Sequence, residues 1–156
     1  MTTEINWQAK TFDQLSTNTL YDLLKLRVDI FVVEQTCYYP ELDDADRVAN
    51  TIHLLGYDGA SLVAYLRILP KGVSYDDCIS IGRVAVAQSH RGQRIGRDLM
   101  EQALSLCDVH FAGQPLKISA QHYLEAFYQS LGFSSVSDVY LEDGIPHIAM
   151  LKQPTK

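Results

Sequence analysis

The sequence predicts a single α/β domain, residues 1–156, in which helices flank a mixed, mostly antiparallel sheet. Strand-like runs on both sides of Asp58-Gly59 indicate a β-hairpin, because this dipeptide favours the tight turns that join antiparallel strands. A strand, a helix and another strand between residues 79 and 121 have the order of a βαβ crossover, whose strands run parallel. The two patterns together require a sheet that contains both strand directions.

The order of the elements follows from apolar spacing and end signals. Ser16 or Thr17 can cap a helix, because a side-chain oxygen there can accept a free N–H of the first turn. Apolar residues then recur at helical spacing down to about Glu34, and residues 35–50 form an acidic loop. The expected elements in order are a strand at 4–11, a helix at 17–34, strands at 51–57, 62–69 and 79–86, a helix at 95–109, a strand at 115–121, a helix at 122–131, and strands at 134–141 and 145–151.

Composition and charge narrow the class of protein. The chain is 47% hydrophobic, and no stretch approaches the roughly 18 apolar residues that a membrane-spanning helix needs, so no membrane partner is expected. The formal net charge of −6 argues against nucleic acid as a partner and is compatible with a cationic substrate. The N-terminus lacks the basic and apolar regions of a signal peptide, so we expect a cytoplasmic protein. The three cysteines are widely spaced and predict neither a metal site nor a disulfide framework.

The stretch 84–97 predicts an anion-binding site. A short β-branched strand runs into a loop that contains Gly92 and Gly96, and a helix follows. The first N–H groups of a helix have no partner within it, and the helix dipole favours negative charge there. Glycines also let a phosphate group approach the main chain closely. We therefore expect a phosphate-bearing ligand to lie between Arg91 and Arg97.

This loop resembles motif A of the GNAT superfamily of acyl-CoA-dependent N-acyltransferases. In that motif Gln or Arg is followed by two residues, Gly, one residue, and Gly or Ala, and here Arg91 fills the first place and Gly96 the last. Arg94 replaces the middle glycine. Its guanidinium would either crowd the pyrophosphate of the cofactor or help to hold it.

A second segment, at 120–133, resembles motif B of the same superfamily. The Tyr-x-x-x-Gly-Phe ending of that motif is matched by Tyr128, Gly132 and Phe133. Two motifs in the right order and at the right separation are more specific than either one. The resemblance extends across nearly the whole chain, and three phrases look like the ElaA-like branch of the superfamily. These phrases lie at 31–35, 81–84 and 143–148.

The resemblance implies two central strands that splay apart and admit the pantetheine arm of acetyl-CoA, the expected acyl donor. The main chain at 84–86 would pair with this arm like an added strand, with the N–H of Val86 directed at the thioester oxygen. Many relatives have an asparagine near the start of the motif B helix, where this chain has Gln121 or His122. The residues expected to bind the cofactor are Val84, Ala85, Val86, Arg91, Gly92, Gln93, Arg94, Ile95, Gly96, Arg97 and Gln121.

Transfer of an acyl group to an amine requires removal of the amine proton and protonation of the departing thiolate. By the resemblance, Tyr128 is the expected general acid, because a phenol with an ordinary pKa of about 10 is protonated at neutral pH. A packed core aromatic is the other interpretation of Tyr128. Glu34 and His53 are taken as catalytic candidates for the base, and a chain of water molecules is an alternative. The remaining base candidates are Asp43, Asp44, Asp46 and His147.

The expected acceptor is a primary amine of a small molecule or a peptide. Glu41, Asp43, Asp44 and Asp46 in the acidic loop would concentrate a cationic amine, unless this loop is an ordinary solvated surface. A homodimer is compatible with the sequence.

Two alternative functions stay open. Arg27, Arg67 and Arg83 look like arginines of acyl-homoserine-lactone synthases, which share the GNAT fold; salt bridges with the many carboxylates are the other interpretation of these residues. The second alternative is a catalytically silent module that binds acyl-CoA without transferring the acyl group.

Overall fold

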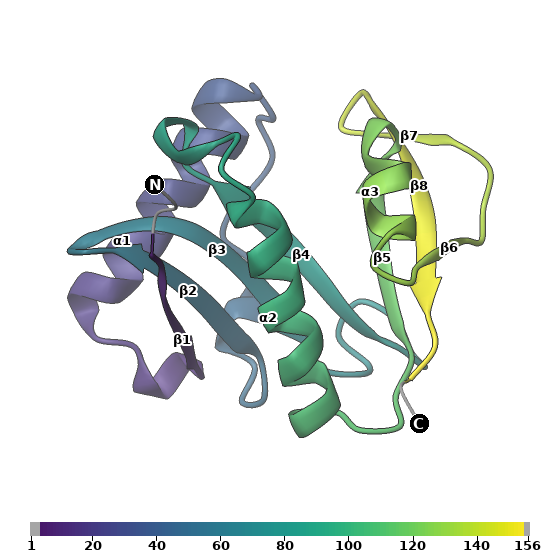
Figure 1. The fold of residues 1–156 in the computed structure, drawn as a ribbon, viewed down its shortest axis with the longest axis horizontal. Helices are drawn as coiled ribbons and strands as arrows, with labels where there is room; N and C mark the ends of the chain where they lie inside the picture. Colours follow the sequence, from purple (N-terminus) through teal and green to yellow (C-terminus); the bar gives the residue numbers. More distant parts are fainter. Residues whose placement is uncertain (1–3, 155–156) are drawn as a thin grey trace.

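The computed structural model describes residues 4–154, which form one mixed sheet with helices on both faces (Figure 1). The strands are β1 (Asn6–Lys10), β2 (Ile52–Asp58), β3 (Ser61–Leu69), β4 (Ile79–Val86), β5 (Leu116–Gln121), β6 (Ser134–Ser135), β7 (Tyr140–Glu142) and β8 (Ile145–Lys152). The α-helices are α1 (Thr17–Arg27), α2 (Ile95–His110) and α3 (Glu125–Gln129). The π-helix η2 (Val28–Glu34) continues α1, and the 3₁₀ turns are η1 (Phe12–Gln14), η3 (Asp44–Arg47), η4 (Gln88–His90) and η5 (His122–Leu124). The predicted α/β class is confirmed.

The sheet has the strand order β1-β2-β3-β4-β5-β8-β6, and β7 also pairs with β8. Every pair is antiparallel except β4 and β5, which are parallel and joined through α2. The β2–β3 hairpin turns where the Asp58-Gly59 dipeptide predicted it. Gly59 has a φ of 60° there, a left-handed conformation that costs glycine little because it has no Cβ.

The parallel strands β4 and β5 pair only where they begin. Their register pairs are Ile79 with Leu116 and Ser80 with Lys117, and within the described chain no further pair joins the two strands. Both strands nevertheless continue, and they diverge from this end (Figure 1). On its other edge β5 is paired with β8 along its whole length. The splayed central strands that the family resemblance implied are therefore present.

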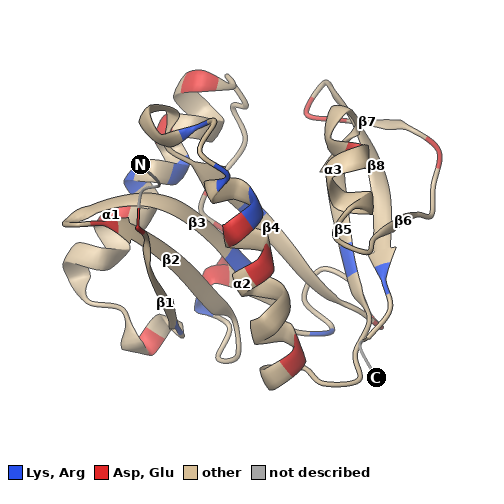
Figure 2. Ribbon diagram, viewed as in Figure 1, with Lys and Arg blue, Asp and Glu red and all other residues tan. Residues whose placement is uncertain are grey.

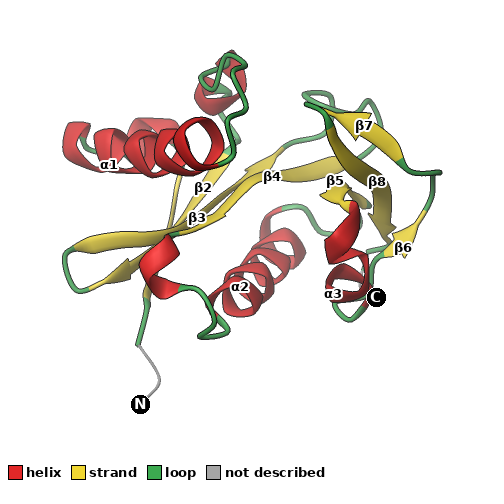
Figure 3. Ribbon diagram, turned by 90° about the horizontal axis from the view of Figure 1, so that it is seen from above, coloured by secondary structure: helices red, strands yellow, loops and turns green. Residues whose placement is uncertain are grey.

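The two faces of the sheet carry different helices (Figure 3), with α1 on one face and α2 and α3 on the other. Alternation along β3 supplies both cores. Ala64 and Leu66 pack with Leu99 of α2 in the larger core. Tyr65 packs with Leu23 of α1 in the smaller core, and all five side chains are completely buried. This arrangement positions β3 and β4 as the shared wall between α1 and α2.

Some element boundaries differ from the sequence prediction. The predicted cap of the first helix is confirmed, since the Ser16 hydroxyl accepts the N–H of Thr19 at 3.1 Å. The predicted helix at 122–131 is a 3₁₀ turn followed by the short α3. The predicted strand at 134–141 is broken into β6 and β7, because the Ser137 hydroxyl accepts the N–H of Ala149 in place of a main-chain carbonyl.

Three arginines and three carboxylates form a buried ion-pair cluster between the acidic loop and the sheet. Arg27 of α1 and Arg67 of β3 both donate to Oδ1 of Asp46 at 2.9 Å. Arg27 is fully buried and Asp46 nearly so, so this part of the loop is not a solvated surface. The members of this arginine cluster are Arg27, Arg67, Arg83, Glu41, Asp43 and Asp46. The salt-bridge interpretation of the three arginines is confirmed.

The same cluster contacts a β-bulge in β4. The register between β3 and β4 shifts between Tyr65 and Arg67, where β4 carries one extra residue. Arg83 lies in this bulge with a φ of 54°, which is unfavourable for a residue with a Cβ. Its Nε donates to the Glu41 carboxylate at 2.8 Å, and a second nitrogen donates to the Glu41 carbonyl at 3.2 Å. These bonds stabilise the bulge at the place where β4 departs from β5.

The structural role of the arginine cluster is tested by removing the Asp46 carboxylate, which Arg27 and Arg67 share. We expect Asp46→Ala to lower the free energy of unfolding by about 3 kcal/mol, because two buried guanidinium groups each lose one of their carboxylate partners. Asp44→Ala is the matched control, since its carboxylate contacts Arg47 on the surface and such pairs contribute at most about 1 kcal/mol. Urea unfolding measures both as shifts of the midpoint at unchanged slope. Equal midpoints for the two variants would contradict a structural role of the cluster.

Candidate active site

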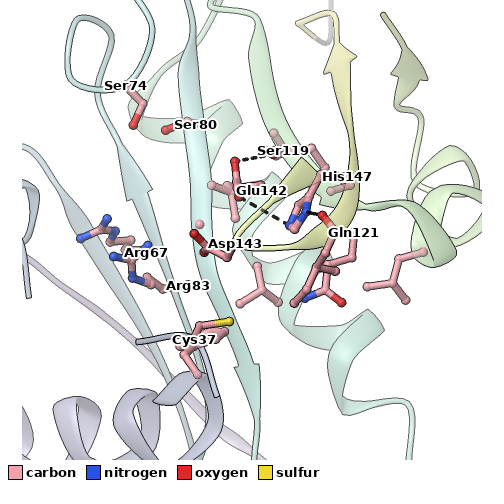
Figure 4. Close-up of a pocket in the computed structure, with 18 of the residues that line it drawn as sticks. Cys37, Arg67, Ser74, Ser80, Arg83, Ser119, Gln121, Glu142, Asp143 and His147 are labelled. Atoms are coloured by element: carbon pink, nitrogen blue, oxygen red, sulfur yellow. Dashed lines mark hydrogen bonds and ion pairs between the residues drawn. The ribbon is translucent and has the colours of Figure 1, made fainter. Parts of the chain in front are cut away.

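A cavity of about 420 Å³ lies where β4 and β5 diverge (Figure 4). Its lining includes Phe31 of η2, on the α1 face of the sheet, and Tyr128 of α3, on the opposite face. Val84 of β4 and Gln121 of β5 line it from the two strand edges. The cavity therefore passes through the sheet and connects its two faces.

Tyr128 lies in this cavity and is held by packing at the end of α3. Its ring lies edge-on to Phe127 and Phe133, with centroids 5.1 and 5.8 Å away. Its carbonyl accepts the N–H groups of Leu131 and Phe133, and Gly132 between them has a φ of 99°. Burial raises the pKa of the phenol to about 12, so the hydroxyl stays protonated at neutral pH. Tyr128 is thus both a packed aromatic and a cavity residue.

The β4 residues expected to bind the cofactor differ in what their side chains contact. The side chains of Val84 and Val86 pack, half buried, against the larger core, and Val84 also lines the cavity. Ala85 points to the other face and packs in the smaller core. A ligand in the gap can therefore reach only the main chain of Ala85. The Val86 carbonyl accepts Nε of Arg91 at 3.1 Å, which fixes the start of the following loop.

The loop between β4 and α2 has the backbone of an anion site. Gly92 and Arg94 have φ values of 81° and 64°, so Arg94 adopts a left-handed conformation at the position of the middle glycine of motif A. The side chain of Ile95 is buried, so this residue can contact a ligand only through its main chain. A Cβ on Gly96 would meet only a Val86 methyl at 3.9 Å, so packing within the protein does not require glycine there. Figure 2 shows basic residues on this loop and the first turn of α2.

Two arginines of this region have protein partners. Arg91 forms a bidentate ion pair with Glu34, the last residue of η2, at 2.6 and 2.9 Å. Arg97 donates to Glu101 and to the Ser130 hydroxyl. Both guanidinium groups remain partly exposed, as does Gln93 in the same loop. They are therefore accessible to an anion from solvent.

The two base candidates that the sequence favoured do not line the cavity. The ion pair with Arg91 holds the pKa of Glu34 below its usual range, which makes this carboxylate a weaker base. His53 is fully buried, with Nδ1 2.7 Å from the Tyr65 hydroxyl and Nε2 3.0 Å from the Asp46 carbonyl. Burial lowers its pKa. In the structure Glu34 connects η2 to the anion loop, and His53 packs beside the arginine cluster.

The base candidate that does line the cavity is His147 of β8. Its Nδ1 lies 2.7 Å from the Ile145 carbonyl, and its Nε2 lies 3.5 Å from Oε2 of Glu142. The Ser119 hydroxyl donates to the other oxygen of Glu142 at 3.1 Å (Figure 4). Sequence reasoning missed Ser119, Glu142 and Asp143 as cavity residues. The signal available for them was the pair of acidic residues at the tip of the last hairpin.

Residues 4–154 contain no group of three or more His, Cys, Asp or Glu side chains that could hold a metal ion. The three cysteines are free thiols. Within the same described residues, no helix has both the length and the apolar character that crossing a bilayer requires.

Splayed parallel strands around a cavity, beside a glycine-containing loop at a helix start, are the features of an acyl-CoA-dependent acyltransferase. The family model described as an acetyltransferase (GNAT) domain matches residues 36–154, and the chain belongs to this family, which binds acyl-CoA.

Three comparisons refine this assignment. The chain is 43% identical to protein ElaA of Escherichia coli (strain K12) over 149 residues, which are 96% of this chain and 97% of ElaA. The crystal structure of E. coli ElaA has a TM-score of 0.91, with 96% of this chain and all of that chain covered. An acyl-CoA N-acyltransferase from Pseudomonas aeruginosa has the same TM-score at 42% identity, covering 96% and 99% of the two chains. The ElaA-like resemblance is confirmed.

A more distant comparison concerns the alternative function. The CoA-dependent acyl-homoserine lactone synthase BjaI has a TM-score of 0.80 at 19% identity, with 98% of this chain and 85% of that chain covered. At this identity the similarity extends to the fold alone.

The anion loop generates a test of cofactor binding. We expect Gly96→Asp to weaken coenzyme A binding at least about tenfold, or 1.4 kcal/mol, because it adds a carboxylate next to the first free N–H groups of α2. Gln102→Asp, an exposed change further along α2, adds the same charge away from the loop and should leave affinity unchanged. Calorimetry with coenzyme A measures both. Unchanged affinity in folded Gly96→Asp protein would remove the loop from the binding site.

Proposed function

We propose that the protein is an N-acetyltransferase that moves the acetyl group of acetyl-CoA to a primary amine, by direct attack within a ternary complex. The observation that carries this proposal is the cavity through the sheet, which joins the Tyr128 side of the gap to the opposite face. A donor and an acceptor can enter such a cavity from opposite faces and meet inside it. Direct transfer needs both substrates in the site at the same time, because no covalent enzyme intermediate is formed.

In this proposal the donor is held at two places. The phosphates bind the loop 91–97, where the start of α2, its helix dipole and partly exposed arginines favour negative charge. The pantetheine arm runs along the open edge of β4, whose main-chain groups beyond Ser80 are not used by β5. The thioester then reaches the cavity beside Val84 and Tyr128.

Tyr128 acts as the general acid in this reaction. The amine nitrogen attacks the thioester carbonyl, the carbon–sulfur bond breaks, and the departing thiolate takes the phenolic proton. The proton that leaves the new amide nitrogen restores the phenol. The high pKa of the buried hydroxyl supports a donor that is fully protonated when the thiolate leaves.

The acceptor in this proposal is a primary amine on a cationic molecule, such as a lysine side chain, a peptide N-terminus or a small polyamine. The carboxylates that support this choice are Glu142 and Asp143, which line the cavity. The acidic loop was the first expectation, but Asp43 and Asp46 contact arginines, and Asp44 contacts Arg47. Those charges are already balanced and attract a cation less.

The role of Tyr128 is tested by removing only its hydroxyl. We expect Tyr128→Phe to lower kcat by about 10²–10⁴-fold with little change in acetyl-CoA affinity, because a proton donor acts in the transition state. The ratio of wild-type to variant rates should stay constant from neutral to mildly alkaline pH, since the phenol ionises only near pH 12. Tyr21→Phe, on the exposed face of α1, is the matched control.

Two outcomes would contradict this account. Wild-type turnover by Tyr128→Phe would make Tyr128 a packing residue. Acetyl-CoA binding without transfer to any member of a broad amine panel, assayed by acetylated product, would identify a silent acyl-CoA-binding module instead.

The charge of the acceptor is tested at Asp143. We expect Asp143→Asn to raise KM for cationic amines several-fold without changing KM for acetyl-CoA, because one attracting charge is lost. Asparagine tolerates the left-handed backbone of this residue, whose φ is 55°. Asp22→Asn on exposed α1 is the control. Wild-type efficiency should also fall as salt shortens the Debye length from about 30 Å to about 10 Å. A neutral preferred acceptor, or efficiency independent of salt, would refute a cationic acceptor.

A further inference from the structure

We propose that His147 is the general base of this transfer and that Glu142 binds the acceptor ammonium beside it. The inference rests on the proposed function, and it deepens it by assigning the step that removes the amine proton. Both residues line the cavity, and the β7–β8 hairpin brings them together from the two sides of its turn.

The main chain fixes which nitrogen of His147 carries a proton. Nδ1 lies 2.7 Å from the carbonyl oxygen of Ile145, and a carbonyl can only accept a hydrogen bond. Nδ1 of the neutral ring must therefore be the N–H, which leaves Nε2 with a free lone pair. Tyr140 stacks on the ring with planes 26° apart and centroids 6.3 Å apart, so the ring is held in this orientation.

A chain of hydroxyl groups fixes Glu142 as an acceptor. The Ser119 hydroxyl donates its only proton to Oε1 of Glu142, so the Tyr140 hydroxyl, 2.5 Å from the Ser119 oxygen, must donate to that oxygen. The hydroxyl groups of Tyr140 and Ser119 therefore both donate in the direction of the Glu142 carboxylate. Its other oxygen, Oε2, lies 3.5 Å from Nε2 of His147.

Nε2 of His147 and Oε2 of Glu142 are thus two neighbouring acceptors in the cavity wall, and no proton lies between them. The neutral ring offers a lone pair at Nε2 and the carboxylate offers one at Oε2. A group that carries several N–H bonds satisfies both at once, and a primary ammonium has three. The pair has the chemistry of a receptor for the protonated form of an amine, which is the form that most alkylamines have at neutral pH.

These residues account for every proton that moves in the reaction. The bound ammonium transfers one proton to Nε2, which becomes an imidazolium paired with Glu142, and the freed nitrogen lone pair attacks the thioester carbon. Tyr128 then protonates the thiolate and recovers a proton from the amide nitrogen. The imidazolium releases its proton to solvent past Glu142, whose side chain is half exposed. The sum is ammonium plus thioester giving amide, thiol and one proton.

The tautomer is tested directly by nitrogen-15 NMR of protein labelled at histidine. The spectrum of His147→Gln identifies the signals of this residue among the five histidines. We expect the neutral ring to be protonated at Nδ1, and the Nε2 signal to shift when n-butylammonium chloride is added. An N–H at Nε2 in the neutral ring, or no response to the ammonium, would overturn the assignment.

Kinetic measurements then show whether His147 acts as a base or only packs in the cavity wall. Two acceptors serve as probes: n-butylamine, which is protonated at neutral pH, and hydroxylamine, which is largely unprotonated there. We expect His147→Gln to lower kcat/KM for n-butylamine by about 10²–10⁴-fold and for hydroxylamine by less than about tenfold, with acetyl-CoA affinity unchanged. Glu142→Gln keeps the bond from Ser119 and should mainly raise KM for n-butylamine. Equal losses for both acceptors, or no loss, would overturn the proposal.

The controls lie outside the cavity. His110→Gln, at the exposed end of α2, and Asp138→Asn, exposed before β7, should behave as wild type. If the wild type acetylates neither amine, the proposed function fails for these acceptors. The NMR result still decides whether His147 has the acceptor nitrogen that the inference requires, so the two failures are distinguishable.

Discussion

The structure depends most on the buried arginine cluster, because it ties the acidic segment 41–46 to the first helix, to β3 and to the bulge of β4. Asp46 joins Arg27 of the first helix to Arg67 of β3, and Glu41 joins Arg27 to Arg83 in the bulge of β4. The acidic segment is thereby fixed as one wall of the cavity. Removing one member of such a buried cluster is costly, because it leaves an uncompensated charge in the interior.

The sequence predicted the fold well where the signals are local. The Asp58-Gly59 turn, the Ser16 cap and the crossover through α2 each follow from residues close together in the chain, and each is found as expected. The divergence of β4 and β5 has no such signal. Apolar alternation along a strand specifies which face is buried, but it does not specify where pairing with the next strand stops. The family resemblance supplied that feature.

The candidate site was less predictable, because its charges are paired over long sequence separations. Acidic residues between 41 and 46 resemble a solvated loop until Arg67 and Arg83 are brought to them. His53 was attractive as a strand histidine, and only the fold shows that both of its ring nitrogens are already bonded. His147 had the same appearance in the sequence. The two histidines differ in the fold, where His147 lines the cavity and His53 does not.

The short pairing of β4 with β5 also bears on self-association. An unpaired strand edge is usually a hazard, since a strand of another molecule can add to it and begin an aggregate. Here the open stretches of the two strands flank a cavity of about 420 Å³, which η2 borders on one face and α3 on the other. This volume is far smaller than a folded domain, so the open strand edges can be reached only by a small or extended molecule. The protein can thus keep unpaired main-chain groups at the centre of its sheet without promoting aggregation.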